Sequence, residues 1–301
     1  MPDVMSPVPP ATSPSKGKVF LSRLVSTVFL WATLTVALWL DLDWLLLGMM
    51  AVVGVLGTWE YVRLQREDEG AGAYSKLVVI LSAGYWAALL GWYAFTENVG
   101  AALWWLDAAL LVIGGQAVFF MAFRQGLEGE KTLRRVFNGF FAMVYTIFLW
   151  GFMAKLLLAG EAANGSMLVL TVILVTKFGD MGAYLFGSWL GKHKMVPHIS
   201  PAKTWEGFGG AVFSSCLGMA IMLLVLEPGT LEPFGNFEAM ALAPFIAVLG
   251  VMGDLAESVL KRCHHIKDSG HKLPGIGGIL DLTDSLLFTV PVVYLFIILF
   301  A

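Results

Sequence analysis

Residues 253–285 read GDLAESVLKRCHHIKDSGHKLPGIGGILDLTDS and lie between two long apolar runs. The segment carries five Asp or Glu residues and four Lys or Arg residues. Ionisable groups beside hydrocarbon cost free energy, and they usually mark a site for ions or substrates. We therefore expect this segment to hold a functional site between two membrane helices.

The composition of the whole chain indicates an integral membrane protein. Its 301 residues are 58% hydrophobic and only 14% charged, whereas about 25% of the residues in soluble domains are charged. The two cysteines, Cys216 and Cys263, are too few for a disulfide framework or a cysteine-based metal site. The proline-rich residues 1–18 predict a disordered cytoplasmic tail, and residues 19–301 predict a single transmembrane domain.

Apolar runs of membrane-spanning length recur along the rest of the chain. A hydrocarbon core of about 30 Å needs about 20 apolar residues per helix. The fold that we predict is an all-α, polytopic membrane protein with about nine transmembrane helices. The predicted spans are 19–40, 44–64, 74–95, 100–122, 136–158, 166–190, 205–227, 239–262 and 279–300.

The distribution of Lys and Arg predicts the orientation of these spans. With the N-terminus in the cytoplasm, all but two of the 19 Lys and Arg residues fall on the cytoplasmic side, as the positive-inside rule requires. The exceptions are Lys155, near an outer helix end, and Lys177, inside the sixth span. The charged segments within 177–285, where we expect the catalytic motifs, then face the nucleotides of the cytoplasm.

The loop after the sixth span contains candidate phosphate ligands. Ser200-Pro201 is typical of a helix N-cap followed by a first-turn proline, which predicts that the seventh span begins there. The free N–H groups of that helix end, with Lys203 and Thr204 beside them, suit a phosphate. Lys192 and Lys194 are explained equally well by the positive-inside rule.

Carboxylates on the last two predicted spans indicate a Mg²⁺ site. Asp254 and Asp281 come from different helices, and unpaired carboxylates would be strongly penalised in a low-dielectric environment. Mg²⁺ prefers oxygen, takes one or two carboxylates and fills its other positions with water and substrate phosphates. The alternative is a network of intramembrane salt bridges, which explains Asp284 and Glu257 equally well. Glu60, in the second span, is interpreted as a charge that reaches out to the interface, or alternatively as a partner of a site residue.

The C-terminal half resembles the phosphatidate cytidylyltransferases, also called CDP-diacylglycerol synthases. The segments Asp180-x-Gly-Ala-Tyr-x-x-Gly and Ser200-Pro-x-Lys-Thr-x-Glu-Gly resemble that family, as does Glu60-Tyr61. The N-terminal half otherwise matches only in hydropathy. The family pattern downstream is matched at Ser258, Lys261-Arg262, Lys267-Asp268, Pro274-Gly275, Gly277-Gly278, Asp281 and Asp284.

The resemblance implies a nucleotidyltransferase for phospholipid synthesis, which transfers a cytidylyl group from CTP to phosphatidic acid and releases pyrophosphate. The cofactor is expected to be Mg²⁺, and a second, monovalent cation is left open. CTP, phosphatidic acid and the lipid bilayer are the expected partners, without nucleic acid, and a homodimer is left open. The expected location is a bacterial inner membrane, with the active site facing the cytoplasm.

Individual roles follow from the residues and the resemblance together. We assign catalytic roles to Asp254, Asp281, Lys261 and Asp284, with Asp254 and Asp281 as the metal ligands. We assign substrate binding to Lys203, Arg262, Lys267, Asp268, Asp180, Ser200, Lys177 and Ser258.

Two positions depart from the family pattern. Ile276 stands where the family usually has His, and Leu282 stands where it usually has Arg. We hypothesise that Lys177, three residues before Asp180, supplies the cation that is absent at position 282. Full activity and full CTP affinity in a Lys177→Met variant would refute this hypothesis. The departures also keep open another acceptor, such as a polyprenyl or ether-lipid phosphate.

A cation-coupled transporter is the alternative from a different functional class. Its ion ligands would be Asp180, Asp254 and Asp281. Transporters often show inverted repeats with interrupted helices at matching positions of their two halves. Here the charges crowd into the second half of the chain, which favours the enzyme. An inactive scaffold is the remaining alternative, and the retained acidic pairs argue against it.

Overall fold

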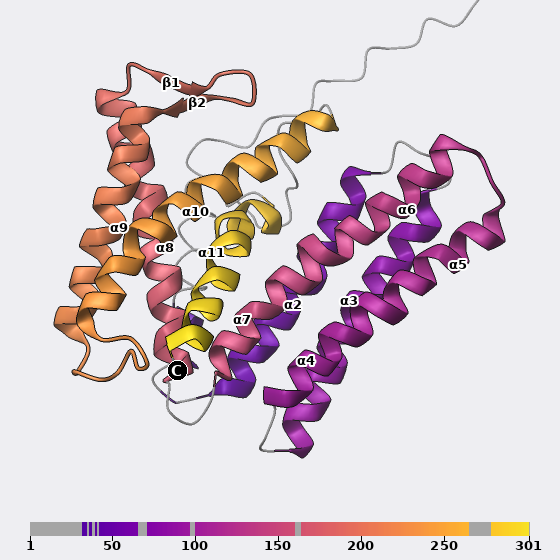
Figure 1. The fold of residues 1–301 in the computed structure, drawn as a ribbon, viewed down its shortest axis with the longest axis horizontal. Coiled ribbons are helices and arrows are strands. Elements are labelled where there is room, and N and C mark those ends of the chain that lie inside the picture. The colour runs from indigo at the N-terminus through magenta and orange to yellow at the C-terminus, as the bar shows by residue number, and fades with distance from the viewer. Residues whose placement is uncertain are drawn as a thin grey trace, which may run out of the picture.

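The protein is represented by a computed structural model. The structure describes residues 32–34, 36–37, 40, 42–65, 71–96, 100–159, 164–264 and 278–300. Within these ranges the chain forms a bundle of helices with one small β-hairpin (Figure 1). The predicted tail, 1–18, and most of the first predicted span, 19–40, lie outside the described residues.

The first half of the bundle contains long helices, two of which include a short π-helical segment. Such segments occur as insertions within otherwise continuous helices. The elements are α2 (Asp43–Leu64), α3 (Ala71–Phe95), α4 (Gly100–Ala109), the π-helical η1 (Leu110–Gly114), α5 (Gly115–Gln125), α6 (Glu130–Ala142), the π-helical η2 (Met143–Phe148) and α7 (Leu149–Leu157).

The second half contains four long helices and the hairpin, whose two strands pair antiparallel. Figure 1 shows the hairpin beyond the ends of α8 and α9, with α11 between α7 and the α8–α10 group. The elements are α8 (Gly165–Leu190), β1 (Lys194–Val196), β2 (Ser200–Thr204), α9 (Trp205–Val225), α10 (Asn236–Cys263) and α11 (Ile279–Phe300).

The predicted all-α, polytopic fold is confirmed. Eight helical segments of the described chain are long and apolar enough to cross a membrane, and they correspond to predicted spans two to nine. The predicted and observed boundaries differ most at the start of the fifth span. The prediction places this start at residue 136, whereas the helix begins at Glu130. Its charged first turns are helical, and buried Arg135 forms a bidentate pair with Glu128, with N–O distances of 3.1 Å. The orientation of the bundle stays a prediction.

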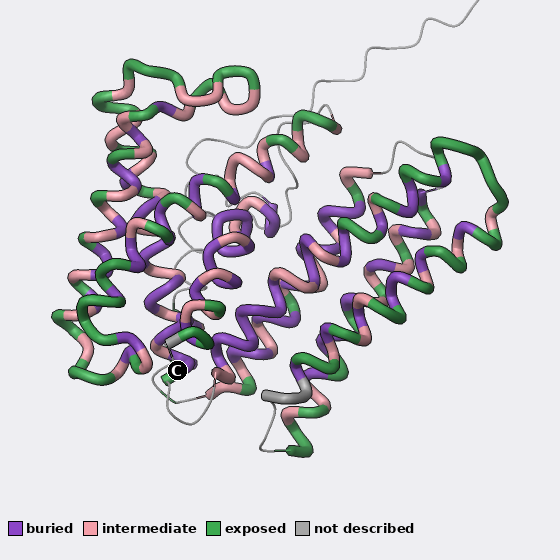
Figure 2. The backbone as a smooth tube through the Cα atoms, in the orientation of Figure 1, coloured by how far each residue is buried: buried purple, intermediate pink, exposed green. Residues whose placement is uncertain are grey.

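Helix α11 lies at the centre of the packing. It contacts α2, α7, α8 and α10, and the buried residues concentrate along α2, α7 and α11 (Figure 2). Side-chain hydrogen bonds join the neighbouring helices: Trp150 Nε1 donates to the Met50 carbonyl at 2.8 Å. This packing carries the acidic N-terminal end of α11 into the interior of the bundle.

Two carboxylates hold the N-terminal end of α11. Glu60 Oε2 accepts a hydrogen bond from the Ile279 N–H at 2.7 Å, and Asp281 Oδ2 accepts one from the Gly278 N–H at 2.9 Å. The first N–H groups of a helix have no partner within it, and negative charge is stabilising there. Glu60 is only 2% exposed, so its interpretation as an interfacial charge is wrong. It is a partner of the helix that carries the acidic motif.

A second buried charge lies among α3, α4 and α7. Lys155 forms an ion pair with Asp107, and both side chains are buried. The Tyr85 hydroxyl donates to the other Asp107 oxygen at 2.9 Å, and Lys155 Nζ lies 3.8 Å from the centroid of the Phe152 ring. Lys155, one of the two lysines that the positive-inside rule does not explain, therefore has its counter-charge within the bundle.

Candidate active site

The hairpin before α9 differs from the local structure that we predicted. Ser200–Thr204 forms strand β2, and α9 begins at Trp205. The N-cap is therefore Thr204, whose Oγ1 accepts from the Gly207 N–H at 3.1 Å. The prediction that Ser200-Pro201 begins the helix is wrong, because this proline lies in a short extended strand. As a result, Lys203 projects from a strand that crosses the end of the helix pair α8 and α9.

Glu206 fixes the hairpin to the first turn of α9. Its carboxylate accepts from the backbone N–H groups of Lys192, at 3.1 Å, and His193, at 3.2 Å. Its Oε1 also lies 2.6 Å from His193 Nδ1. The sequence does not predict these contacts of Glu206. Its only signal is that Glu206 belongs to the segment that resembles the family.

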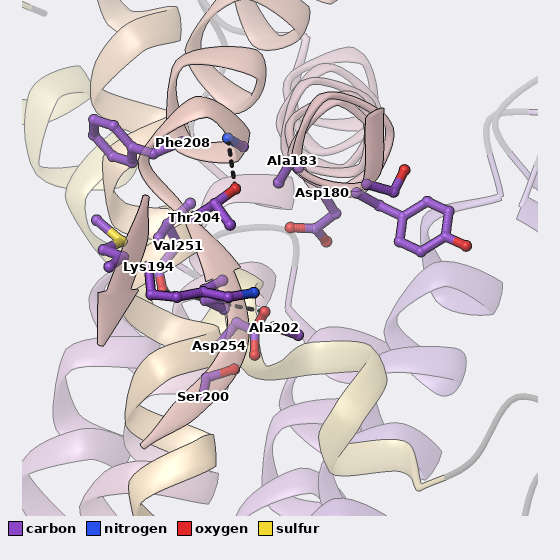
Figure 3. A pocket seen from close by; sticks show the side chains of 15 residues that line it. Asp180, Ala183, Lys194, Ser200, Ala202, Thr204, Phe208, Val251 and Asp254 are labelled. Atoms are coloured by element: carbon purple, nitrogen blue, oxygen red, sulfur yellow. Dashed lines mark hydrogen bonds and ion pairs between the residues drawn. The ribbon is translucent and has the colours of Figure 1, made fainter. Parts of the chain in front are cut away.

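A cavity of about 490 Å³ lies between α8, the hairpin, α9 and α10, and we call it the polar cavity because polar side chains gather in its otherwise apolar wall. Figure 3 shows Asp180 and Asp254 on its wall, from α8 and α10, and Lys194 and Ser200 from the hairpin. Asp180, Ser200 and Asp254 are among the substrate or metal ligands that the sequence predicts, whereas Lys194 is explained equally well by the positive-inside rule. The polar residues that line the cavity are Asp180, Tyr184, Ser188, Lys194, Ser200, Lys203, Thr204 and Asp254.

Lys203 and Asp254 form the central ion pair of this cavity. Lys203 Nζ lies 2.8 Å from Asp254 Oδ2 and donates to the Val251 carbonyl at 3.3 Å. Lys203 is 18% exposed and Asp254 is 43% exposed. The carboxylate is thus open to the cavity, while the stem of the lysine is packed against α10.

Lys261 joins α10 to α11 through two carboxylates. Its Nζ lies 2.8 Å from Glu257 Oε2 and 2.7 Å from Asp281 Oδ1. Glu257 is buried. Asp254 is among the residues that line the polar cavity and Asp281 is not. The structure thus pairs each predicted metal ligand with its own lysine, and their shared binding of one ion stays a prediction.

The two acidic helices approach each other closely beside Asp254. A Cβ atom added at Gly253 would clash with the backbone carbonyl oxygen of Asp284 and lie 3.0 Å from Ser285 Cα, so glycine is required for this contact. The Ser285 hydroxyl donates to Asp180 Oδ1 at 3.2 Å, and Asp284 is buried in the same turn of α11. Asp180, Asp254 and Asp284, which lie far apart in the sequence, therefore belong to one region of the bundle.

The remaining predicted site residues are placed as follows. Arg262 is exposed, and its Nε donates to the Ile199 carbonyl of the hairpin at 3.3 Å. Ser258 is half-buried on α10, between Asp254 and Lys261. Lys267, Asp268 and Ile276 lie outside the described residues. Lys177 donates to Asp180 Oδ2 at 2.9 Å.

The carboxylates of α10 and α11 match the ligand chemistry of Mg²⁺. Within the described ranges, no three Asp, Glu, His or Cys side chains form a cluster that could hold a metal ion. A Mg²⁺ site does not need three such side chains, because one or two carboxylates suffice and water and substrate phosphates fill the other coordination positions. Asp254 and Asp281 supply such oxygens on two helices in direct contact, with lysines beside them to hold phosphates.

The fold and the site define a class: a polytopic helical membrane protein with a cavity lined by lysines and carboxylates at the ends of its helices. The chain belongs to the cytidylyltransferase family, a family of nucleotidyltransferases, whose model matches residues 21–300. This membership removes the support for a transporter.

Individual relatives match over different lengths. The uncharacterized protein YnbB of Escherichia coli K12 is 36% identical over 217 residues, which are 71% of this chain and 69% of the relative. The phosphatidate cytidylyltransferase of Bacillus subtilis 168 is 44% identical over 122 residues, 40% of this chain and 44% of the relative. That of Staphylococcus aureus COL is 39% identical over 136 residues, 45% of this chain and 51% of the relative. The match thus spans about half of each of these two cytidylyltransferases.

Proposed function

We propose that the protein transfers the cytidylyl group of CTP to phosphatidic acid, giving CDP-diacylglycerol and pyrophosphate. The observation that carries the proposal is the Lys203–Asp254 pair within a polar cavity of about 490 Å³ at the ends of membrane helices. That volume lies within the range of roughly 300–1,000 Å³ that is typical of small-molecule sites. The family match and the names of the two bacterial relatives support the same reaction.

The chemistry of this reaction needs charge neutralisation more than it needs a base. The nucleophile is a phosphate oxygen of the lipid, which is anionic at neutral pH. It forms a bond to the α-phosphorus of CTP, and the bond from that phosphorus to the bridging oxygen of the β-phosphate breaks. Pyrophosphate leaves with the electron pair. Fixed cations that face the charge developing in the transition state lower the barrier.

Residues of the cavity, of α10 and of the first turns of α11 are suited to these tasks. Lys203, from the hairpin, and Lys261, on α10, hold phosphate oxygens of the nucleotide. Asp254 and Asp281 would hold Mg²⁺, which would neutralise charge on the triphosphate as a Lewis acid. Asp284 supports this acidic group from α11. The further proposed substrate ligands are Asp180, Ser200, Ser258, Arg262, Lys267 and Asp268.

The membrane sets the routes of the two substrates. The hairpin and the polar cavity belong to the segment that the positive-inside rule assigns to the cytoplasm. CTP enters from that side, and the lipid enters sideways from the inner leaflet of a bacterial cell membrane. The predicted orientation, with a cytoplasmic N-terminus, therefore brings a water-soluble nucleotide and a membrane lipid to the same depth.

The experiment is an assay of the purified protein in lipid nanodiscs with CTP, Mg²⁺ and phosphatidic acid, followed by pyrophosphate release and lipid analysis. A polyprenyl phosphate and an ether-lipid phosphate are tested as alternative acceptors. Lys203→Met is expected to lower kcat/KM for CTP at least tenfold, because a charge-assisted contact is worth about 1.5–3 kcal/mol. Lys192→Met, from the exposed start of the same loop, is the matched control. Absence of pyrophosphate release with every acceptor would contradict the proposal.

A further inference from the structure

A second cavity lies among the membrane helices. It has a volume of about 240 Å³, is partly open, and lies mainly between α2, α7, α8 and α11. Its walls are almost entirely apolar and include Met50, Trp150, Ile173 and Leu286. Lys177 is the one charged side chain among the described residues that line it.

The apolar cavity meets the polar cavity at one ion pair. Lys177 lines the apolar cavity, and Asp180, one turn further along α8, lines the polar cavity. Lys177 Nζ lies 2.9 Å from Asp180 Oδ2. Ser285 of α11 donates to the other oxygen of Asp180, which fixes the carboxylate between the two spaces.

Lys177 is placed to bind an anion that enters from the apolar side. Its side chain is 27% exposed, and a lysine in the interior of a membrane protein is costly without a partner. Its ammonium has three N–H donors, and Asp180 accepts one of them. A phosphate at the mouth of the apolar cavity can accept from the same ammonium without breaking the pair.

The residue at position 282 faces the same space as Lys177. Leu282, on α11, also lines the apolar cavity. An apolar side chain at 282 keeps the α11 wall of the cavity suitable for hydrocarbon. The positive charge is instead carried by Lys177, on the α8 wall. Lys177 and Leu282, which the sequence hypothesis linked, therefore line one cavity.

We propose that the apolar cavity holds an acyl chain of the lipid acceptor, and that Lys177 binds the acceptor's phosphate. This inference rests on the proposed function and assigns the second substrate to its own part of the site. The volume is below the typical range for a whole small molecule, roughly 300–1,000 Å³, and suits part of one chain. Three methionines in the wall, Met49, Met50 and Met153, let it adapt to chain shape, because Met fills irregular gaps.

The geometry then orders the two substrates around Asp180. The nucleotide lies in the polar cavity, and the acceptor phosphate lies at Lys177, on the other side of the ion pair. The attacking oxygen approaches the α-phosphorus from the lipid side, and pyrophosphate leaves on the cytoplasmic side. Lys177 is thus a binding residue for the acceptor rather than for CTP.

The first test separates the KM values of the two substrates. Lys177→Met is expected to raise KM for phosphatidic acid by roughly ten- to a hundredfold, because it removes a charge-assisted contact, and to change KM for CTP less than twofold. Lys177→Arg is expected to restore most of the lipid affinity. Lys177→Met with Leu282→Arg is also expected to restore it, because the cation returns to the same cavity. An unchanged KM for the lipid in Lys177→Met would overturn the inference.

The second test does not depend on turnover. Phosphatidic acid with a diazirine in one acyl chain is photocrosslinked to the full protein in nanodiscs, and the labelled peptides are mapped. Labels are expected on the cavity walls of α2, α7 and α8, and Ile173→Trp, which fills the cavity, is expected to reduce them at least fivefold. Labels at these walls in a protein without cytidylyl transfer would defeat the proposed function alone. Normal transfer with labels elsewhere would overturn this inference alone.

Discussion

Lys261 Nζ on α10 lies 2.7 Å from Asp281 Oδ1 on α11. The same ammonium lies 2.8 Å from Glu257 Oε2, on its own helix. One cation therefore connects the two helices whose acidic residues form the proposed centre. Its removal would leave two carboxylates facing each other in the interior of the bundle.

The variant Lys261→Met tests this connection. It is expected to lower the unfolding free energy by about 3 kcal/mol, because breaking a buried ion pair leaves an uncompensated charge. Cytidylyl transfer is expected to fall at least a hundredfold, while Lys261→Arg keeps the charge and most of the stability. Thermal unfolding in detergent and the pyrophosphate assay measure the two effects. Wild-type stability and activity in Lys261→Met would show that the connection is dispensable.

Glu60 positions the acidic end of α11 from a distant part of the chain. Glu60→Ala removes the acceptor of the Ile279 N–H, so we expect a loss of about 1 kcal/mol, typical of a lost cap. We expect kcat to fall, because Asp281 shifts, with little change in KM for CTP. Glu60→Gln keeps an acceptor oxygen and should recover most of both losses. An equal loss in the Gln and Ala variants would argue against the capping role.

Glu206 is expected to act on nucleotide binding through the hairpin. Glu206→Ala frees the backbone of Lys192 and His193, so that β1, which pairs with the strand carrying Lys203, loses its anchor. A displacement of about 1 Å can cost up to a hundredfold in rate, and we expect KM for CTP to rise about tenfold. KM for the lipid should stay within twofold. A rise in the lipid KM alone would contradict this division of the site.

The buried pair of Lys155 and Asp107 is expected to serve stability rather than catalysis. Lys155→Met leaves Asp107 unpaired in the bundle, which is expected to cost about 3–5 kcal/mol. Adding Asp107→Asn should recover most of that loss, because no buried charge then remains. Specific activity well below the unfolding temperature is expected to be unchanged in the double variant. Thermal unfolding curves of the single and double variants provide the measurement.

Much of the fold could be predicted from the sequence, because the bilayer imposes one length on every span. Hydropathy alone therefore located the eight described spans, including Ile279–Leu299. It failed where polar residues are helical, as at Glu130, and where a short strand contains residues typical of a helix start, as at Ser200. The hairpin is held by contacts between residues that are distant in sequence, such as Glu206 with His193. The conformational propensities of single residues do not predict such contacts.

Candidate site residues could be selected from the sequence where a residue type is rare in its setting, and their roles stay predictions. A lysine within an apolar span, Lys177, and acidic residues on successive spans stood out without any structure. The partner of Glu60 could not be predicted, because the N–H that it binds belongs to Ile279, on a helix at the other end of the chain. Nor could the sequence show that Lys177 and Leu282 line one cavity, since that depends on how α8 and α11 pack.

The central claim is that carboxylates from α10 and α11 together hold a divalent cation for the nucleotide. Its most direct test is an electron paramagnetic resonance titration of Mn²⁺, in place of Mg²⁺, into the protein in nanodiscs with saturating CTP. The account predicts one tightly bound ion per chain in the wild-type protein and in the double variant Lys155→Met, Asp107→Asn, and loss of that ion in both Asp254→Asn and Asp281→Asn. Unchanged binding of Mn²⁺ in either of these last two variants would contradict it.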